Sequence, residues 1–495
     1  MITWGISANS HDAALAVFTD DGLEFASHTE RFSGVKNDAH LNKEIVNYAR
    51  QWGEPDEVIW YERPFRKTLR QIRAGQGFNF RENNINRYLR QYDISAPIKY
   101  TDHHLAHAAA GFYTSPFREA TVVCIDSIGE FESLTIWNGD ENGLKRIYSQ
   151  SYPHSVGLWY SALTQRVGLK PQEDQYILMG MAAYGDPLRL FNDVLHDFFH
   201  PLDDDSFKQI FFNTPTIKLK HNLHRGCTWW RPDLTTEQDM FDIAAATQAV
   251  YSYLLKYISN WARWKSPSGN LVLMGGCALN CSANGSIKSD WNDMYIMPNP
   301  GDAGSAIGCV LAHKKQHMPI PHMYTGYNIE GEYPVEEVLH ELLTTGICGV
   351  ASGRAEFGPR AFGNRSLLAD PRGTDIKDRV NTIKRRQKFR PFAPAVLEEH
   401  ASTYFDGYVS PFMQYTATCT DLGLPAIVHG DGTSRVQTVS ANQSVGFRKL
   451  LERWYEETGC PILLNTSLNI KGKPMVNTVE DAVEFEQHYG VKVFT

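Results

Sequence analysis

The feature that most constrains the fold is a pattern of three strands and two turns that occurs twice in the chain. Residues 2–30 predict three strands, with the sequences ITWGIS, ALAVFTD and LEFASHTE, separated by Asn-Ser-His-Asp and Asp-Asp-Gly turns. Residues 120–151 repeat the plan with ATVVCIDSIGE, SLTIWNGD and LKRIYSQS. The repetition predicts a duplicated actin-like or ribonuclease-H-like α/β fold, in which the first turn of each copy faces a nucleotide phosphate. Two unrelated meanders are the alternative.

Two glycine-rich turns follow later in the chain. The strand NLVLMGG (270–276) runs into the small-residue sequence ALNCSANGSI, and PNPGDAGSAIG opens a helix at 303–314. Helix starts of this kind expose free backbone N–H groups, which suit a phosphate or a ribose. Each turn alone is a weak signal, because such turns are common in α/β proteins.

A change in composition divides the chain. Residues 315–335 are rich in proline, glycine and polar residues and are predicted to be a linker, so we expect one domain over 1–325 and a second over 335–495. The second begins with a dense basic set between Arg354 and Arg390, in which the charges alternate with Gly, Pro and Phe. This mixture favours convergence on an anion over a solvated face.

The overall composition excludes several classes. A hydrophobic share of 42% and a charged share of 21% are typical of a soluble globular protein, and a net charge of −8 gives no general electrostatic case for nucleic-acid or membrane binding. The eight cysteines are scattered through mostly apolar sequence, which favours reduced thiols. No leader or membrane-spanning stretch is evident, so we expect a cytoplasmic protein without a membrane partner.

Two histidines and two aspartates form a candidate metal site. The sequence DHHLAHAAAGFY predicts a helix in which His103 and His107, four residues apart, lie on one face and can share an ion. Asp126 ends the apolar strand TVVCID, and Asp302 lies in the turn PGDAGSAIG. Such a ligand set suits Fe²⁺, Zn²⁺ or Mn²⁺. His104 points elsewhere and is a candidate for a supporting or substrate contact.

At these residues the chain resembles the NodU/CmcH family of O-carbamoyltransferases. The resemblance runs from about residue 3 to 485, and its motifs occur in the family's order: HDAALAVF, DHHLAHAAAGFY, CIDSIGE, GMAAYGDP, GGCALN, PNPGDAGSAIG, EFGPRAFGNRSLLADPR, KFRPFAPAVL, DGTSRVQTV and PILLNTSLNIKGKPMV. The N-terminal part also looks like a threonylcarbamoyl-adenosine transferase subunit. The C-terminal part looks like an α+β YrdC domain, which binds nucleotides and carbamoyl-type substrates.

The resemblance implies a reaction in two steps. Carbamoyl phosphate is cleaved in the YrdC-like domain, and the carbamate formed attacks the α-phosphate of ATP, supplied with Mg²⁺, to give carbamoyl-adenylate. An alcohol then takes the carbamoyl group in the N-terminal domain. AMP held through a metal is a good leaving group, and a closed path protects the labile intermediate from water.

The resemblance also implies roles for individual residues. The metal ligands are His103, His107, Asp126 and Asp302, with Fe²⁺ expected ahead of Zn²⁺ or Mn²⁺. The nucleotide contacts are Gly129, Glu130, Gly275, Gly276, Asn280 and Asp302. The carbamoyl-phosphate set is Arg360, Arg365, Lys384, Arg386, Arg390, Arg435, Ser467 and Asn469, with Arg390 also catalytic. His11 is the expected general base for the acceptor hydroxyl, and Lys36 lines the same site.

Two departures from the family pattern qualify the resemblance. Ile177 stands where family members usually carry Lys, and Gln387-Lys388 stands in place of Glu-Pro. The first puts a contact at the acceptor or nucleotide site in doubt. The second leaves Lys384 and Arg390 in place.

The acceptor is not determined by the sequence. Residues 63–92 and 218–231 are basic and interleaved with aromatic side chains, which suits a phosphate backbone and a stacked or flipped base. A hydroxymethylated pyrimidine in DNA, as in carbamoylated phage-type DNA, is therefore one candidate acceptor, and a small-molecule or sugar hydroxyl is the other. The oligomeric state, monomer or homodimer, is open too. Rival classes are an actin-fold sugar kinase and a non-catalytic nucleic-acid-binding protein, neither of which would release phosphate from carbamoyl phosphate.

Overall fold

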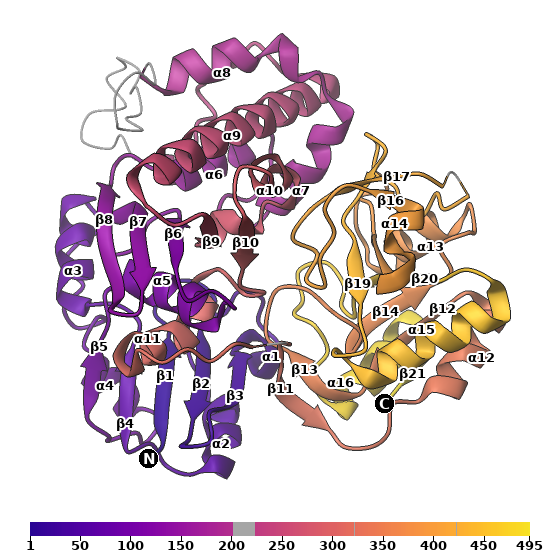
Figure 1. Cartoon of the computed structure of the whole chain (residues 1–495), viewed down its shortest axis with the longest axis horizontal. Coiled ribbons are helices and arrows are strands. Elements are labelled where there is room, and N and C mark those ends of the chain that lie inside the picture. The colour runs from indigo at the N-terminus through magenta and orange to yellow at the C-terminus, as the bar shows by residue number, and fades with distance from the viewer. Residues whose placement is uncertain (201–222, 321, 422) are drawn as a thin grey trace. The chain divides into compact units, whose positions relative to one another are not determined.

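Two five-stranded sheets dominate the first 320 residues of the computed structural model, which describes residues 1–200, 223–320, 322–421 and 423–495 (Figure 1). One sheet has the order β3-β2-β1-β4-β5 and the other β10-β9-β6-β7-β8. The strands are β1 (Thr3–Ser7), β2 (Ala14–Phe18), β3 (Leu23–His28), β4 (Glu57–Trp60), β5 (Ile98–Tyr100), β6 (Ala120–Ile125), β7 (Glu132–Asp140), β8 (Gly143–Ser151), β9 (Asn270–Met274) and β10 (Asp293–Ile296).

The two sheets share one plan. In each, the first strand of the repeated pattern is central, and two later strands extend the sheet in parallel: β4 and β5 beyond β1, and β9 and β10 beyond β6. In the second sheet, β7 and β8 continue the other side in antiparallel pairing. The mixed α/β class is confirmed. The two strand orders agree with the repeated sequence pattern, while a duplicated actin-like fold stays a prediction.

The chain forms two compact units. The first comprises Met1–Asn9, Val17–Gly22 and Trp52–Pro319, and the second comprises Ser10–Ala16, Leu23–Gln51 and Ile320–Thr495. The helices of the first unit are α3 (Pro64–Arg73), α4 (Ile85–Arg90), α5 (His103–Thr114), α6 (Val156–Arg166), α7 (Gln175–Met181), α8 (Phe191–Phe198), α9 (Glu237–Lys265), α10 (Cys281–Lys288) and α11 (Ser305–Lys314). In the described residues, no helix is long and apolar enough to cross a membrane.

Helices α5 and α11 form the centre of the first unit. The two helices pack on each other, α11 also packs on β1, and α5 packs on β6 and β9, so the pair lies between the two sheets (Figure 1). Their close approach requires Gly308, because a Cβ there would stand 1.9 Å from the carbonyl oxygen of Ala106. The buried alanines and glycine of α5 thus bring its histidines to the interior.

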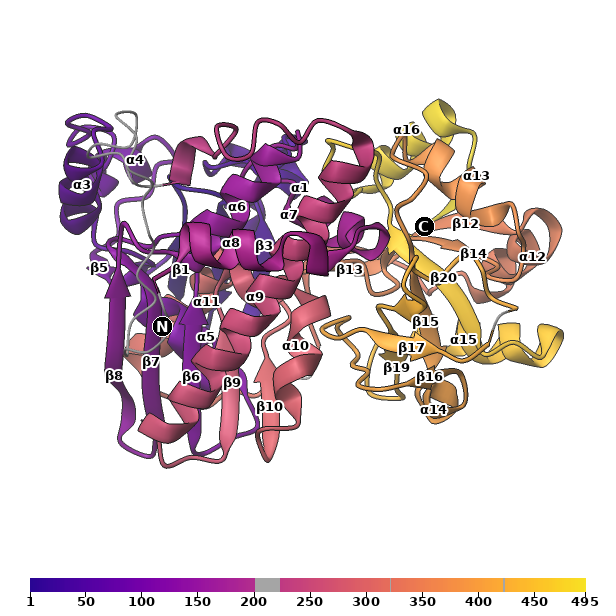
Figure 2. The ribbon, with the colours of Figure 1, turned by 90° about the horizontal axis from the view of Figure 1, so that it is seen from above.

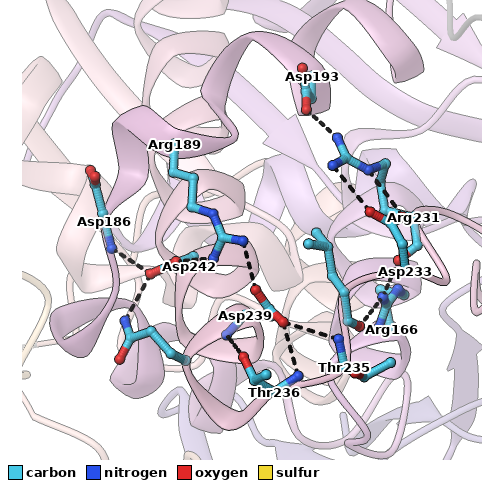
Figure 3. Close-up of polar contacts among 12 residues, drawn as sticks. Arg166, Asp186, Arg189, Asp193, Arg231, Asp233, Thr235, Thr236, Asp239 and Asp242 are labelled. Atoms are coloured by element: carbon cyan, nitrogen blue, oxygen red, sulfur yellow. Dashed lines mark hydrogen bonds and ion pairs between the residues drawn. The ribbon is translucent and has the colours of Figure 1, made fainter.

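Arginines fix the start of α9 (Figure 3). Arg189 bonds Asp239 at 2.7 Å and Asp242 at 2.6 Å, and Asp239 completes a capping box with Thr236. Arg166 donates to the carbonyl oxygens of three residues in the preceding loop: Trp230, Arg231 and Leu234. These bonds satisfy the free groups of the helix end and hold the loop that leads into it.

The second unit is built on a six-stranded sheet of order β19-β15-β20-β14-β12-β21. Its strands are β11 (Tyr324–Ile329), β12 (Ile347–Ala351), β13 (Gly353–Glu356), β14 (Arg365–Ala369), β15 (Ala393–Leu397), β16 (Phe405–Asp406), β17 (Ala417–Cys419), β18 (Thr433–Ser434), β19 (Gln437–Val439), β20 (Ile462–Ser467) and β21 (Val493–Phe494). Its helices are α1 (Glu30–Ser33), α2 (Lys43–Ala49), α12 (Val335–Thr345), α13 (Ile376–Ile383), α14 (Ala401–Tyr404), α15 (Val445–Thr458) and α16 (Val479–Tyr489).

Both faces of this sheet are buried. Along β14, Leu367 and Leu368 belong to different apolar clusters, and along β20, Ile462 and Leu463 do the same. This alternation is that of a sheet covered on two sides. One expectation is corrected here: within the predicted linker 315–335, residues 324–329 form β11, which pairs antiparallel with β13. The polar residues of that segment led to the prediction of a linker, although such residues also occur in a strand at the edge of a sheet.

Candidate active site

The four predicted metal ligands converge in the first unit. The side-chain donor atoms of His103, His107, Asp126 and Asp302 all lie within 4.8 Å of one another. The Nε2 atoms of the two histidines are 3.1 Å apart, and each lies 3.3–3.4 Å from an oxygen of Asp302. Asp126 Oδ2 lies 3.4 Å from Nε2 of His103. Both imidazoles are buried, so this group is closed from bulk water on the histidine side.

Three different elements bring these ligands together. His103 and His107 lie one turn apart on α5, as their spacing predicts. Asp126 follows the last residue of β6, and its backbone N–H donates to the carbonyl oxygen of Ser133. Asp302 opens the short turn that leads into α11. The ligands therefore come from the tip of a buried strand and from the ends of two packed helices.

The electrostatics of this group favour a bound cation. Burial opposes a charge on His103, but the carboxylates of Asp302 and Asp126 outweigh it and raise the pKa of this imidazole well above its usual value. Burial likewise raises the pKa of Asp302, and the two histidines more than reverse the effect. Two imidazole nitrogens that face each other at 3.1 Å need a shared cation or proton between them. The residue types and their spacing fit a divalent ion.

The turn that contains Gly129 packs closely against the histidines. A Cβ on Gly129 would lie 2.7 Å from Cδ2 of His103 and 3.0 Å from Cδ2 of His104, so only glycine fits there. On the other side, Gly275 has a positive φ of 87°, and a Cβ there would meet the carbonyl oxygen of Ile125 at 2.2 Å. The glycines of two expected nucleotide turns thus allow the backbone to approach the group closely.

An arginine on α3 joins the two segments that flank the ligands, a role that sequence reasoning did not predict. Arg66 lies 3.0 Å from Glu130 and 2.7 Å from Glu132 on the turn after Asp126, and 3.6 Å from Asp102 immediately before His103. Arg63 also ion-pairs with Asp102, and its N–H donates to Glu130. Burial raises the pKa of Glu130 to about 7 in spite of these partners. The sequence signal for this network is the set of acids in the motifs DHH (Asp102) and SIGEFE (Glu130 and Glu132), which are complementary in charge to the basic helix α3.

The side chain of Asn280 is held by hydrogen bonds within the first unit. Its Oδ1 accepts from the N–H of Ala283 at the start of α10, and its amide exchanges two 3.0 Å hydrogen bonds with Gln248. Tyr160 donates to the same Gln248. The hydrogen-bonding groups of this side chain are thus occupied by protein partners. We therefore infer that Asn280 holds the turn in place and does not contact the nucleotide directly.

The expected general base and its neighbour lie in the second unit. His11 Nδ1 is 3.1 Å from Oδ2 of Asp12, which has a positive φ of 50°. Burial raises the pKa of Asp12, but the bond from His11 and nearby cations outweigh it and lower the pKa overall. A carboxylate on one ring nitrogen orients an imidazole for proton transfer at the other. Lys36 bonds both oxygens of buried Glu30 at 2.8 Å.

Part of the predicted carbamoyl-phosphate set converges in the second unit. The Nζ of buried Lys384 bonds the carbonyl oxygen of Ser467 at 2.5 Å and both oxygens of Asn469 at 2.9 Å. Burial, with Arg386 and Arg390 nearby, lowers the pKa of Lys384 well below its usual value. In the described part of the chain, Lys384 has no carboxylate partner. A buried cation among neutral oxygens and other cations is suited to an anionic ligand.

Two further arginines of the set have partial protein partners, and a third has, among the residues described, an unpaired buried donor. Arg360 donates to the carbonyl oxygens of Phe412 and Met413. Arg386 donates to Asn381 and Pro391 and lies over the ring of Phe392. Arg435 differs, because its Nε is buried without a hydrogen-bond partner in the described residues. Such an orphaned donor is costly unless a ligand or water satisfies it.

Arg365 requires a correction. It is fully buried, and its guanidinium donates to main-chain carbonyl oxygens of five residues: Tyr327, Ser352, Gly353, Asn364 and Asn477. An anion could bind this group only after those bonds break. The structure therefore gives Arg365 a role in holding the loops around β14, and we remove it from the candidate anion site.

The basic segment 63–92 also differs from expectation. Lys67 and Arg70 are buried, and Lys67 bonds Glu62 at 2.6 Å and the carbonyl oxygen of Asn9 at 2.7 Å. With Arg66 in the acidic network, these charges are not available to a phosphate backbone. For Arg66, Lys67 and Arg70, the expectation that the basic residues of 63–92 suit a phosphate backbone is therefore wrong. In the second basic segment, 218–231, residues 218–222 lie outside the described residues.

Comparison with known proteins identifies the family. Residues 58–311 match the family model "Carbamoyltransferase N-terminus", and residues 339–495 match "Carbamoyltransferase C-terminus". The chain belongs to the carbamoyltransferase family. The resemblance to the NodU/CmcH enzymes is confirmed, and the protein is a transferase of carbamoyl groups.

Curated relatives cover almost the whole chain. The nodulation protein NolNO of Sinorhizobium fredii is 30% identical over 96% of this chain and 76% of its own length. The 3'-hydroxymethylcephem-O-carbamoyltransferase of Amycolatopsis lactamdurans is 27% identical over 97% of this chain and 95% of its own. Among solved structures, component A of the (R)-2-hydroxyglutaryl-CoA dehydratase of Acidaminococcus fermentans matches 64% of this chain and 98% of its own, at 13% identity and a TM-score of 0.37, which is too low to support an argument.

Proposed function

We propose that this carbamoyltransferase makes carbamoyl-adenylate from carbamoyl phosphate and ATP and transfers the carbamoyl group to an acceptor hydroxyl. Water and carbamoyl phosphate give carbamate and phosphate. A carbamate oxygen then attacks the α-phosphorus of ATP, and pyrophosphate leaves. Finally the acceptor oxygen attacks the carbonyl carbon, its proton passes to a base, and AMP leaves. The observation that carries the proposal is that one chain combines the His–Asp group with a cluster around buried Lys384, which has no carboxylate partner among the described residues.

The basic cluster would serve the first step. We assign carbamoyl-phosphate binding to Arg360, Lys384, Arg386, Arg390, Arg435, Ser467 and Asn469. A phosphate dianion would give Lys384 and Nε of Arg435 a charged partner, which neither has within the described ranges of the chain. Arg390 would stabilise the charge that builds on the departing phosphate. These groups bind and orient the substrate and supply no covalent step of their own.

The His–Asp group would serve the transfer step. His103, His107, Asp126 and Asp302 would hold a divalent cation, with Fe²⁺ our first choice and Zn²⁺ or Mn²⁺ the alternatives; ATP would bring Mg²⁺. When bound, the cation neutralises phosphate charge and so improves AMP as a leaving group. The Gly129 and Gly275 turns would let the nucleotide phosphates approach closely. His11, oriented by Asp12, would take the proton of the acceptor hydroxyl, and Lys36 would remain beside it.

Several further expectations belong to the same proposal. The N-terminal domain, 1–325, would be the actin-like transfer domain and the C-terminal domain, 335–495, the YrdC-like domain. The enzyme would act in the cytoplasm as a monomer or homodimer. The acceptor would be either a small-molecule or sugar hydroxyl or a hydroxymethylated pyrimidine in DNA.

A single assay series tests this proposal. The enzyme is incubated with ATP, Mg²⁺ and carbamoyl phosphate, and phosphate and pyrophosphate are measured; an acceptor panel that includes DNA containing hydroxymethylcytosine is then examined for a carbamoyl adduct by mass spectrometry. His11→Ala should keep phosphate release and fail at transfer. A sugar kinase would make ADP and a sugar phosphate, and a non-catalytic binding protein would release nothing. Absence of carbamoyl-phosphate cleavage in the metal-loaded enzyme would refute the proposal.

A further inference from the structure

Helix α3 exposes two of its apolar side chains and buries three of its polar ones. Lys67, Thr68 and Arg70 are buried, whereas Phe65 is 65% exposed and Leu69 is 41% exposed. A surface helix normally has the opposite arrangement. The buried charges are accounted for by ion pairs and hydrogen bonds within the first unit. The exposed ring of Phe65 and the side chain of Leu69 therefore form an apolar surface that needs a separate explanation.

The loop after α3 adds two more exposed rings. Phe78 is 78% exposed and Phe80 is 54% exposed. Asn83 attaches this loop to α3, because its amide donates to Thr68 at 2.8 Å and to Gln71 at 2.7 Å. The loop is thus attached to α3 and leads into α4 (Figure 2).

Exposed arginines accompany these rings. Arg73, Arg81, Arg87 and Arg90 are exposed, and among the described residues none of them has a side-chain hydrogen bond or an ion pair. Exposed arginines elsewhere, such as Arg372 and Arg379, pair with carboxylates. Between residues 64 and 91 the only acid is Glu82, although the whole chain carries a net charge of −8. The segment is therefore a local cationic surface on an acidic protein.

We propose that this surface, defined by Phe65, Leu69, Phe78, Phe80, Arg73, Arg81, Arg87 and Arg90, binds single-stranded nucleic acid. Exposed guanidinium groups suit phosphates, and exposed phenyl rings suit unpaired bases, which all have a face for stacking. The surface offers both kinds of group within one short segment. The inference rests on the proposed function for its purpose, since a bound strand would present the hydroxymethylated base as acceptor.

Binding can be measured without catalysis. A fluorescently labelled, unmodified single-stranded DNA of about 20 nucleotides, enough for one or two sites, is titrated with the full chain, and anisotropy is recorded over a range of salt concentrations. Phe78→Ala with Phe80→Ala should weaken binding by about tenfold or more, because a stacked base contributes about 1–3 kcal/mol. The combined change of the four arginines to Gln should flatten the salt dependence by about 0.7 slope units for each phosphate that the protein no longer neutralises.

Matched controls separate this surface from general charge and aromatic effects. Trp264→Ala removes a ring that is 73% exposed on α9, and Arg118→Gln removes an exposed arginine elsewhere in the first unit. Both should leave oligonucleotide binding unchanged. All variants should keep phosphate release from carbamoyl phosphate, which reports on folding and on the proposed function independently of DNA.

Each contrary result is distinct. Equal oligonucleotide affinity and salt slope in wild type and surface variants would overturn the inference. So would binding only to vesicles of anionic lipid, or concentration-dependent dimerisation, seen by light scattering, that the phenylalanine changes abolish. If DNA binding behaves as expected but carbamoyl phosphate is never cleaved, the surface stands and the proposed function fails. If carbamoyl phosphate is cleaved but DNA is not bound, the proposed function stands and the proposed surface fails.

Discussion

The His–Asp group of the first unit and the basic cluster of the second are both built from buried and half-buried charged side chains, but they satisfy those charges in different ways. The four His and Asp side chains face one another, with donor atoms within 4.8 Å. In the second unit, Arg360, Arg365 and Lys384 donate instead to carbonyl oxygens. Short, rigid ligands that face one another define a single cation position. Long basic side chains with several donors can serve the fold and a ligand at once.

This difference predicts unequal responses to mutation. In the His–Asp group, removal of one side chain should prevent metal binding, because the four ligands act together. In the basic cluster the effect should depend on whether a particular side chain holds the backbone or faces the ligand.

The largest effect is expected at the metal group. His107→Ala or Asp126→Ala should abolish carbamoyl transfer and reduce bound metal to a small fraction of one equivalent, because each removes one of the four ligands that the described residues supply. Metal content is measured by mass spectrometry of the purified protein. His104→Gln, on the same helix but outside the group, is the control and should keep its metal. Full metal and activity in both alanine variants would contradict the assignment.

A contrast between two arginines comes next. Arg365→Met should destabilise the fold by about 3 kcal/mol or more, because it leaves several buried carbonyl oxygens without donors. Arg390→Gln should change stability far less but eliminate phosphate release from carbamoyl phosphate. Urea unfolding and a phosphate assay measure the two properties. A stable Arg365→Met variant that fails only in phosphate release would return Arg365 to the anion site.

A smaller effect is expected at Arg66. Because this residue bonds the segments before His103 and after Asp126, Arg66→Gln should weaken metal binding about tenfold, as removal of the groups that support metal ligands often does. Arg146→Gln removes another partner of Glu132 but touches neither Asp102 nor Glu130, and serves as the matched control. Calorimetric titration with Zn²⁺ gives the affinities. Equal weakening in both variants would indicate a general effect of removing a positive charge.

The smallest effect is a change in pH dependence at Lys384. Its folded pKa lies well below the usual 10.5, so between that lowered pKa and 10.5 the unfolded chain binds more protons than the folded one. Stability from this group therefore rises with pH across that window. Lys384→Met should flatten the slope of unfolding free energy against pH within that window, below pH 10.5. An unchanged slope would show that Lys384 is charged in the folded protein.

Local chemistry made some of this site predictable and left other parts open. The spacing of His103 and His107 determines their common helix face, and an aspartate after a buried strand has few structural explanations. Arg365 was misassigned because an arginine among glycines has the same sequence signature whether it binds an anion or caps carbonyl oxygens. Arg66 was misread for a related reason: its acidic partners Glu130 and Glu132 are distant in the chain. Lys67 pairs with Glu62, just before the helix, and buried Arg70 donates to Gln76; the sequence pattern alone does not show that these two side chains turn inward.

The sequence by itself determined the family, the α/β class, the repeated strand pattern and the identity of the candidate metal ligands, because these depend on local periodicity and on residue types in fixed order. Tertiary structure alone decided which basic side chains are available. That choice depends on burial and on partners distant in the chain, such as the carbonyl oxygens around Arg365 and the acids around Arg66. A guanidinium group carries the same charge in each place, and only its surroundings determine whether it holds the fold together or remains available to a ligand.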